Sequence, residues 1–387
     1  MERASFAERS GGRSLAAGRC GVPAKLTDPA VRAAPEICVG SGQAPLRTPC
    51  PAPPRRPGPA PPITCTMANG RPVMPSLESR LTVWWMRWAR HRRQRVAKRG
   101  TPQPVQPAAP SARHRRQARI TLAPLDGHPV YRVAPTGRSG EPAPAGRILY
   151  LHGGAYVRPI NRHHWNFVVD LAGRSGCEIV VPLYPLAPRH NGLTAFDFVS
   201  RLYRRESADL RPLILMGDSA GGGLALALAG WIRDQSLPAA RQLVLLSPWL
   251  DVEIPHPQAL QLQAADPMLT LDGLRRAGRA YAGPLGGAHP VISPARSDPR
   301  GLPPMAIHVG GRELIGPDVI DYAVRVRALG GSVELNRVPA MMHVWPLLGF
   351  PEALAARALI ARQLRTALGE PPLPAASSSG QPVGAAA

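Results

Sequence analysis

Short apolar runs alternate with helical patterns over the middle and C-terminal parts of the chain. Helical periodicity is clearest at 220–234, 319–329 and 352–368. Because strand-like and helical segments alternate, the pattern predicts an α/β fold with a mostly parallel central sheet and helices on both faces. Alternation at 118–125 and 129–133 predicts an antiparallel pair ahead of that sheet. The strand-like runs lie at 147–152, 178–184, 213–217, 243–247, 305–309 and about 332–338.

Another helical pattern, rich in arginine, precedes the sheet. Leu77, Leu81, Trp84, Trp85 and Trp88 recur at spacings that place them on one face of a helix over about 76–98. We expect this apolar stripe to pack on the folded domain. Peripheral contact of residues 76–98 with a membrane surface, through Trp and Arg, is the alternative, and a homodimer stays open as well.

Composition divides the chain into four parts. Residues 1–73 are rich in Pro, Arg and Ala and lack apolar periodicity, so we expect a disordered tail, with Met67 and Met74 as alternative translation starts. Residues 74–117 then hold the basic helix and a linker, and residues 118–370 form the α/β domain. A second disordered tail is expected at 371–387.

Charge and cysteine content exclude several classes of function. The formal net charge is +22, but residues 1–120 hold 22 of the 47 Lys and Arg and only 5 of the 25 Asp and Glu. A nucleic-acid partner for the folded domain is therefore not predicted. No Cys or His spacing fits a metal site, and no cofactor is expected. Because no 18-residue apolar stretch or export signal is found, we expect a cytoplasmic protein.

The pentapeptide Gly217-Asp218-Ser219-Ala220-Gly221 lies where an apolar strand meets a helix of small residues. Strand, sharp turn and helix form the context in which a Gly-x-Ser-x-Gly pattern presents a nucleophilic serine. The serine occupies a strained turn, and the glycines let neighbouring backbone pass without Cβ collisions. Ser219 is therefore the candidate nucleophile.

A serine hydroxyl needs a general base that a third group orients. His343 follows the last predicted strand, at the same edge of the sheet as Ser219, and is the candidate base. Glu313 follows the strand at 305–309 and is the preferred acid. Asp318 is its rival, but it begins a helical pattern, where a first-turn carboxylate is expected for structural reasons.

A third glycine-rich turn follows another apolar strand. In His152-Gly153-Gly154 the glycines free backbone N–H groups to point at a developing oxyanion. With these motifs the chain resembles the hormone-sensitive-lipase-like branch of the α/β-hydrolase superfamily, over about residues 118–368. The motifs that carry the resemblance are His152-Gly153-Gly154, Tyr184-Pro185-Leu186-Ala187-Pro188, Gly217-Asp218-Ser219-Ala220-Gly221-Gly222, Ser247-Pro248-Trp249-Leu250-Asp251, Asp266-Pro267-Met268-Leu269 and Met342-His343-Val344-Trp345.

This resemblance implies an α/β-hydrolase fold and a Ser219, His343 and Glu313 triad. The N–H groups of Gly153, Gly154 and Ala220 are implied as oxyanion donors. One departure is Ala155, which stands where a third glycine is usual.

The resemblance also implies a helical cap, built from the helix near 76–98 and a segment of about 252–283. The implied substrate is a small ester with a short to medium acyl chain, or a lactone. A non-catalytic ligand-binding protein on the same fold is the alternative, and the presence of both Ser219 and His343 disfavours it.

Overall fold

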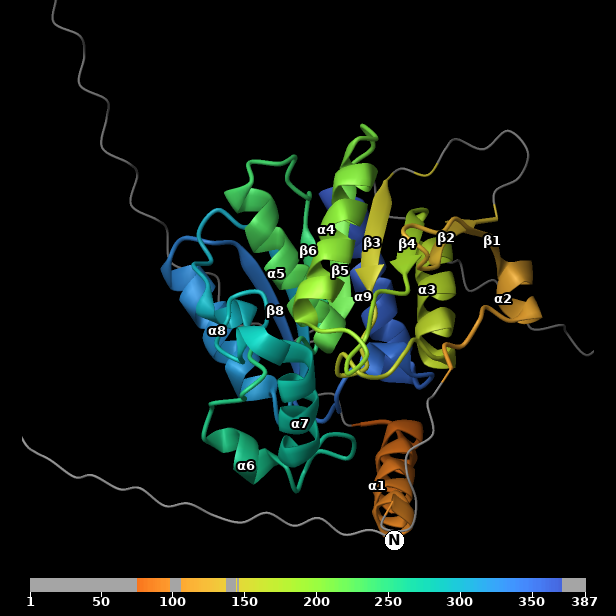
Figure 1. Cartoon of the computed structure of the whole chain (residues 1–387). Coiled ribbons are helices and arrows are strands. Elements are labelled where there is room, and N and C mark those ends of the chain that lie inside the picture. The colour runs from red at the N-terminus through yellow and green to blue at the C-terminus, as the bar shows by residue number, and fades with distance from the viewer. Residues whose placement is uncertain (1–74, 98–105, 137–143, 145, 371–387) are drawn as a thin grey trace, which may run out of the picture. The chain divides into compact units, whose positions relative to one another are not determined.

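A mostly parallel sheet organises the part of the chain that the computed structural model describes, residues 75–97, 106–136, 144 and 146–370. The tails expected at 1–73 and 371–387 lie outside these residues. Within them, eight strands form one sheet in the order β1-β2-β4-β3-β5-β6-β7-β8 (Figure 1). The strands are β1 Ala118–Leu122, β2 Val130–Pro135, β3 Arg147–Leu151, β4 Glu178–Pro182, β5 Leu213–Asp218, β6 Leu243–Leu246, β7 Met305–Gly310 and β8 Val333–Val338.

The predicted mixture of strand directions is confirmed. Strands β1 and β2 pair antiparallel, β2 pairs antiparallel with β4, and all other neighbours run parallel. Asp218 of β5 is level with Leu246 of β6, which is level with His308 of β7. The carboxyl ends of three neighbouring strands therefore reach the same edge, where open parallel sheets carry their functional groups.

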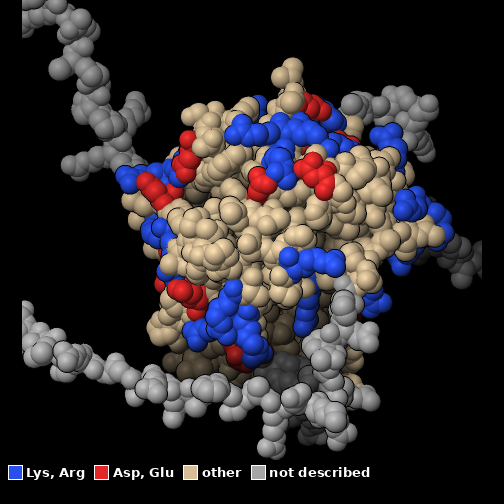
Figure 2. All heavy atoms as spheres, in the orientation of Figure 1, with Lys and Arg blue, Asp and Glu red and all other residues tan. Residues whose placement is uncertain are grey.

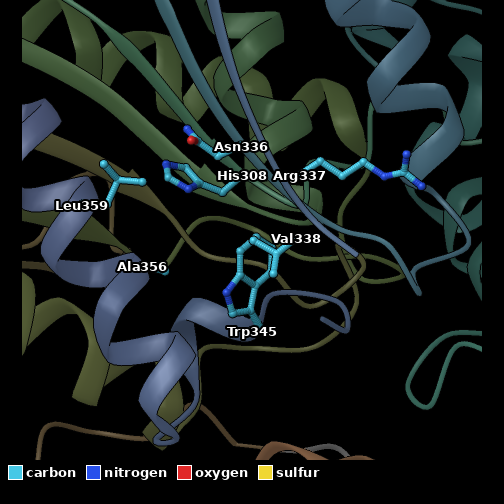
Figure 3. A pocket seen from close by; sticks show the side chains of 7 residues that line it. All are labelled: His308, Asn336, Arg337, Val338, Trp345, Ala356 and Leu359. Carbon is cyan, nitrogen blue, oxygen red and sulfur yellow. The ribbon is translucent and has the colours of Figure 1, made fainter. Parts of the chain in front are cut away.

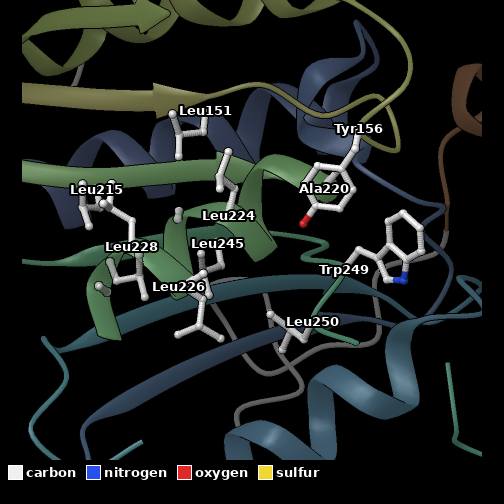
Figure 4. Close-up of a cluster of buried hydrophobic side chains, with 14 of the residues drawn as sticks. Leu151, Tyr156, Leu215, Ala220, Leu224, Leu226, Leu228, Leu245, Trp249 and Leu250 are labelled. Carbon is white, nitrogen blue, oxygen red and sulfur yellow. The ribbon is translucent and has the colours of Figure 1, made fainter. Parts of the chain in front are cut away.

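Helices cover both faces of the sheet because its strands are apolar on both sides. Leu149 and Leu151 of β3 belong to one apolar layer, whereas Ile148 and Tyr150 belong to the other. Figure 4 shows the first layer, in which α5 lies against the sheet. Helices α4, α5, α7 and α8 contribute to it, and α3 and α9 to the second layer. The helices are α1 Leu77–Ala97, α2 Ala112–Gln117, α3 Arg162–Ser175, α4 Gly192–Ser207, α5 Ala220–Asp234, α6 Gln258–Leu262, α7 Leu271–Ala282, α8 Gly316–Ala328 and α9 Pro351–Ala367.

Helix α1 forms where the sequence predicts it, but the prediction that its Leu and Trp stripe packs on the domain is wrong. The five stripe residues are between 49% and 66% exposed. Ser79 and Val83, on the opposite side of the helix, are buried instead, and Val83 packs in a small cluster with Met341 and Trp345. Periodicity identified the more apolar face of α1, whereas the face that packs on the domain carries the smaller side chains Ser79 and Val83.

The segment 252–283 holds α6 and α7. Tyr281 of α7 stacks on Tyr156, which follows β3, with ring centroids 3.5 Å apart. This segment therefore contacts the carboxyl edge of the sheet. None of the helices in the described ranges combines the length and apolar character needed to cross a bilayer.

Candidate active site

Ser219 lies in the sharp turn between β5 and α5. Its backbone has φ 51° and ψ −120°, a strained conformation for a residue with a side chain. The flanking glycines fit by close approach, because a Cβ on Gly217 would lie 2.3 Å from the Gly221 carbonyl oxygen and one on Gly221 would lie 2.0 Å from the Leu151 carbonyl oxygen. The turn therefore needs glycine at both positions, and it directs Ser219 to the carboxyl edge of the sheet.

His343 lies between Ser219 and Glu313. Its Nε2 atom is 2.8 Å from Ser219 Oγ, and its Nδ1 atom is 2.7 Å from Glu313 Oε2. All three side chains are buried, with Glu313 at 0% and His343 at 3% exposure. The structure thus brings together the three residues that the sequence singled out, in an order that would let a proton pass from Ser219 to His343.

Glu313 is held in place by two further donors. Its Oε1 atom accepts hydrogen bonds from the Ser247 hydroxyl, at 2.8 Å, and from the backbone N–H of Gly310. Asp318, the rival acid, lies in the first turn of α8, and its titratable neighbours are Asp251, His256 and Asp321. Burial raises the pKa of Asp318 to about 6, and this carboxyl is not a partner of His343.

The environment tunes His343 toward protonation. Burial alone would lower its pKa, but the hydrogen bond to Glu313 and the charge of that carboxylate outweigh burial, so the pKa of His343 lies above the ordinary value. Its neighbour Asp266 adds a smaller effect in the same direction. A base with a raised pKa accepts the serine proton more readily.

The glycine turn after β3 corrects one prediction. The backbone N–H of Gly153 donates to Asp218 Oδ1 at 2.9 Å, so it is not available to an oxyanion. Gly154, with φ 129°, and Ala155, with φ 54°, follow it in left-handed conformations. Their N–H groups, like that of Ala220, donate to no protein acceptor in the described part of the chain, so these three are the groups that remain for an oxyanion. The unusual Ala155 adopts a conformation that suits glycine.

Asp218 is a residue whose role the sequence did not suggest. Its carboxylate accepts from the Tyr150 hydroxyl at 2.5 Å and from Gly153, and His164 Nε2 lies 3.4 Å away. Burial would raise the pKa of Asp218, but His164 and the two hydrogen-bond donors outweigh it and hold the pKa below the ordinary value. An anionic Asp218 thus connects the nucleophile strand to the glycine turn. Its place beside Ser219 at a strand end was the available signal.

Ser247 is a second residue that sequence reasoning missed. It is fully buried, follows β6, and has φ 45°. Its hydroxyl donates to Glu313 and accepts from the backbone N–H of Val344, at 3.0 Å, directly after His343. Because β6 lies between β5 and β7, the end of this strand faces both the nucleophile and the acid, and that position could have identified it.

Other histidines have structural surroundings. His308 Nε2 lies 3.0 Å from Gln363 Oε1, and burial lowers the pKa of His308 to about 4. Figure 3 shows it beside Trp345 at a cavity of only about 10 Å³ that no triad residue lines. Burial likewise lowers the pKa of His152 to about 4, so this residue stays neutral beside the glycine turn. In the described residues, no three His, Cys, Asp or Glu side chains are arranged for a metal ion.

Comparisons with known proteins agree with the fold. Residues 148–347 match the alpha/beta hydrolase fold family. The chain is 32% identical over 278 residues to a putative acetyl-hydrolase, LipR, of Mycobacterium tuberculosis, which covers 70% of this chain and 86% of the relative. It is 31% identical to an acetyl-hydrolase of Streptomyces hygroscopicus, over 58% of this chain and 76% of the relative. A solved hormone-sensitive lipase from a metagenome library is 29% identical, with a TM-score of 0.64 over 75% of this chain and 98% of the other.

Proposed function

Because this chain belongs to the hormone-sensitive-lipase-like branch of the alpha/beta hydrolase family and is a carboxylic ester hydrolase, we propose that it acts through Ser219, His343 and Glu313. The observation that carries this proposal is the chain of hydrogen bonds at 2.8 Å and 2.7 Å that joins the three side chains. A non-catalytic ligand-binding protein, the alternative, would not need a base and an acid aligned on a serine hydroxyl.

In the proposed mechanism, His343 Nε2 removes the Ser219 proton as Oγ attacks the ester carbonyl carbon. Glu313 fixes the imidazole with Nδ1–H directed at Oε2, and its charge stabilises the imidazolium that forms. The imidazolium then gives its proton to the leaving alcohol. A water molecule activated by His343 hydrolyses the acyl-enzyme and restores Ser219.

The oxyanion of the tetrahedral intermediate is proposed to accept hydrogen bonds from the N–H groups of Gly154, Ala155 and Ala220. This set replaces the predicted one, in which Gly153 stood in place of Ala155. The Gly153 N–H acts on the turn itself, because its bond to Asp218 fixes the backbone from which the next two N–H groups project.

For the substrate, we propose short to medium acyl esters or lactones. The relatives are named acetyl-hydrolases and esterases, which favours small acyl groups. A cap formed by α1 and the segment 252–283 is proposed to set the size limit, because Tyr281 of α7 stacks on Tyr156 directly after the glycine turn.

The test is active-site labelling combined with turnover. The protein should hydrolyse p-nitrophenyl butyrate and take up one fluorophosphonate group, and Ser219→Ala should lose both by several orders of magnitude. Ser236→Ala is the matched control, since Ser236 also has φ 51° but lies exposed near the other end of α5. Labelling of Ser219→Ala at the parent rate, or ligand binding without turnover, would reject the mechanism.

Other predicted properties stay proposals. They are a cytoplasmic location, the absence of a nucleic-acid partner, pairing of two copies, and contact of residues 76–98 with a membrane surface. The last two compete for one exposed face of the molecule.

A further inference from the structure

The outer face of α1 is an apolar surface that faces away from the domain. We use this name for Leu77, Leu81, Trp84, Trp85 and Trp88, whose exposed fractions lie between 49% and 66%. Their spacing places them along one side of the helix. Soluble proteins rarely expose several large apolar side chains in one contiguous patch, and such patches mark interaction sites.

The orientation of α1 is fixed by contacts at its first turns. Glu352 of α9 accepts hydrogen bonds from the backbone N–H of Ser76, at 2.5 Å, from the Ser76 hydroxyl, at 2.8 Å, and from the Ser79 hydroxyl, at 3.4 Å. Val83 packs with Met341 and Trp345, on the other side of the helix. To turn the tryptophans inward, the helix would have to break all of these contacts. The outer face is therefore exposed because of how the helix is held.

The charge of α1 is strongly positive. The helix contains six arginines and one acidic residue, Glu78. Arg80 and Arg87 form no ion pair with any residue of the described ranges. On the surface seen in Figure 2, several acidic side chains lie beside basic ones. Elsewhere on the domain, Arg201 pairs with Asp126 and Asp197. The described arginines of α1, Arg80 and Arg87, lack such carboxylate partners among the described residues, so their charge is available to an external anionic surface.

We propose that the outer face of α1 docks on an anionic lipid surface. Tryptophan favours the boundary between water and acyl chains, and arginine pairs with lipid phosphates. A second copy of this chain is the competing occupant. It would bring two arginine-rich helices together, each with one acidic residue, Glu78, to offset their repulsion, and this charge distribution disfavours it.

The location of α1 gives this docking a consequence for catalysis. Arg87 donates to the carbonyl oxygen of Ala265, in the segment 252–283, at 3.0 Å. The cluster that holds Val83 includes Met342, which precedes His343. The helix thus lies beside the proposed cap and against the loop of the base. This consequence rests on the proposed mechanism at Ser219: docking would hold the carboxyl edge of the sheet close to esters dissolved in the bilayer.

The experiment uses the full chain and sonicated vesicles of phosphatidylcholine, with or without 30 mol% phosphatidylglycerol. The variant Trp84→Ser with Trp85→Ser removes two side chains of the outer face. Its matched control is Leu122→Ser with Leu210→Ser, which removes two other exposed apolar side chains, away from α1. Co-sedimentation gives the partition coefficient, light scattering gives the mass, and p-nitrophenyl butyrate in free solution gives the turnover.

We expect the parent and the control to bind the anionic vesicles and to bind the neutral ones about tenfold more weakly. The partition coefficient of the tryptophan variant on anionic vesicles should be about tenfold below that of the parent. Turnover of the dissolved ester should be unchanged in both variants. Absence of turnover in the parent would reject the proposed substrate and mechanism and leave the lipid proposal untouched. Three results would overturn the lipid proposal. They are equal binding of the parent and the tryptophan variant to anionic vesicles, equal binding of the parent to anionic and neutral vesicles, and a dimeric mass for the parent and the control with a monomeric mass for the tryptophan variant.

Discussion

Substitution of Ser247 by alanine should uncouple the acid from the base without touching either. The Ser247 hydroxyl contacts both the Glu313 carboxylate and the backbone beside His343. Alanine removes the hydroxyl that donates to Glu313 Oε1 at 2.8 Å. The Val344 N–H, which donates to the same hydroxyl at 3.0 Å, loses its acceptor.

The expected loss can be estimated from these two bonds. A buried hydrogen bond to a charged group contributes about 1.5–3 kcal/mol, and an orphaned buried N–H costs about 1–3 kcal/mol. We therefore expect Ser247→Ala to lower the free energy of unfolding by about 3 kcal/mol. In the transition state His343 carries a positive charge and depends on a well-placed Glu313, so kcat/KM should fall by about 10–100-fold, equivalent to about 1.4–3 kcal/mol.

The assay is urea unfolding together with kcat/KM for p-nitrophenyl butyrate between pH 5 and 9. Ser293→Ala is the matched control, because Ser293 is equally buried and its hydroxyl accepts from the Val252 N–H, at 3.0 Å, and donates to the Gly287 carbonyl oxygen, at 2.6 Å, away from the triad. The control should lose similar stability and keep its pH profile. A kcat/KM for Ser247→Ala within twofold of the parent, or an equal loss of kcat/KM in Ser293→Ala, would refute the reasoning.

Three further predictions concern the acid, the buried histidines and the chain ends. Glu313→Gln should lower kcat/KM for p-nitrophenyl butyrate by about 10²–10⁴-fold and shift its acidic limb to lower pH, because the pKa of His343 loses the partner that raises it, whereas Asp318→Asn should leave the limb in place. Burial lowers the pKa values of His152 and His308 to about 4, so below about pH 6.5 the unfolded chain binds more protons than the folded one. Their contribution to the free energy of unfolding is therefore full above that pH and is lost as the pH falls toward 4. The expected loss at pH 5 is about 2 kcal/mol for each histidine. Urea unfolding at pH 7 and 5 checks this, and a His308→Gln variant with an undiminished drop would contradict it. A chain that begins at Met74 should keep full esterase activity. A chain that begins at Thr101 should give less soluble protein, because it lacks α1, whose Val83 covers Met341 and Trp345. Equal soluble yields of the two chains would show that α1 is dispensable.

Much of the fold could be predicted because strands that are buried on both faces of a parallel sheet appear in the sequence as short continuous apolar runs. The run at 213–217 became β5 and the pattern at 220–234 became α5, with Ser219 in the turn between them. His343 and Glu313 could be singled out for a related reason, since both follow predicted strands and parallel strands end at one edge.

What could not be predicted depends on direction and on distant partners. The turn at Gly153 and Gly154 was expected to offer N–H groups, but spacing does not reveal that the first of them donates to Asp218. His164 approaches the same carboxylate from α3, a contact that no local pattern encodes. Periodicity found the apolar face of α1, yet the side that the domain covers depends on the shape of a surface formed by residues more than 250 positions away, such as Glu352.

The carboxylate of Asp218 has a consequence for attempts to redesign this enzyme. Because it is the residue next to the nucleophile, a library that varies position 218 would seem to sample the wall of the substrate pocket. Its side chain, however, is 1% exposed and is engaged by Tyr150, His164 and the Gly153 N–H. Such a library would sample the shape of the turn that carries the Gly154 and Ala155 N–H groups, so its variants would differ in rate on every ester rather than in preference among esters.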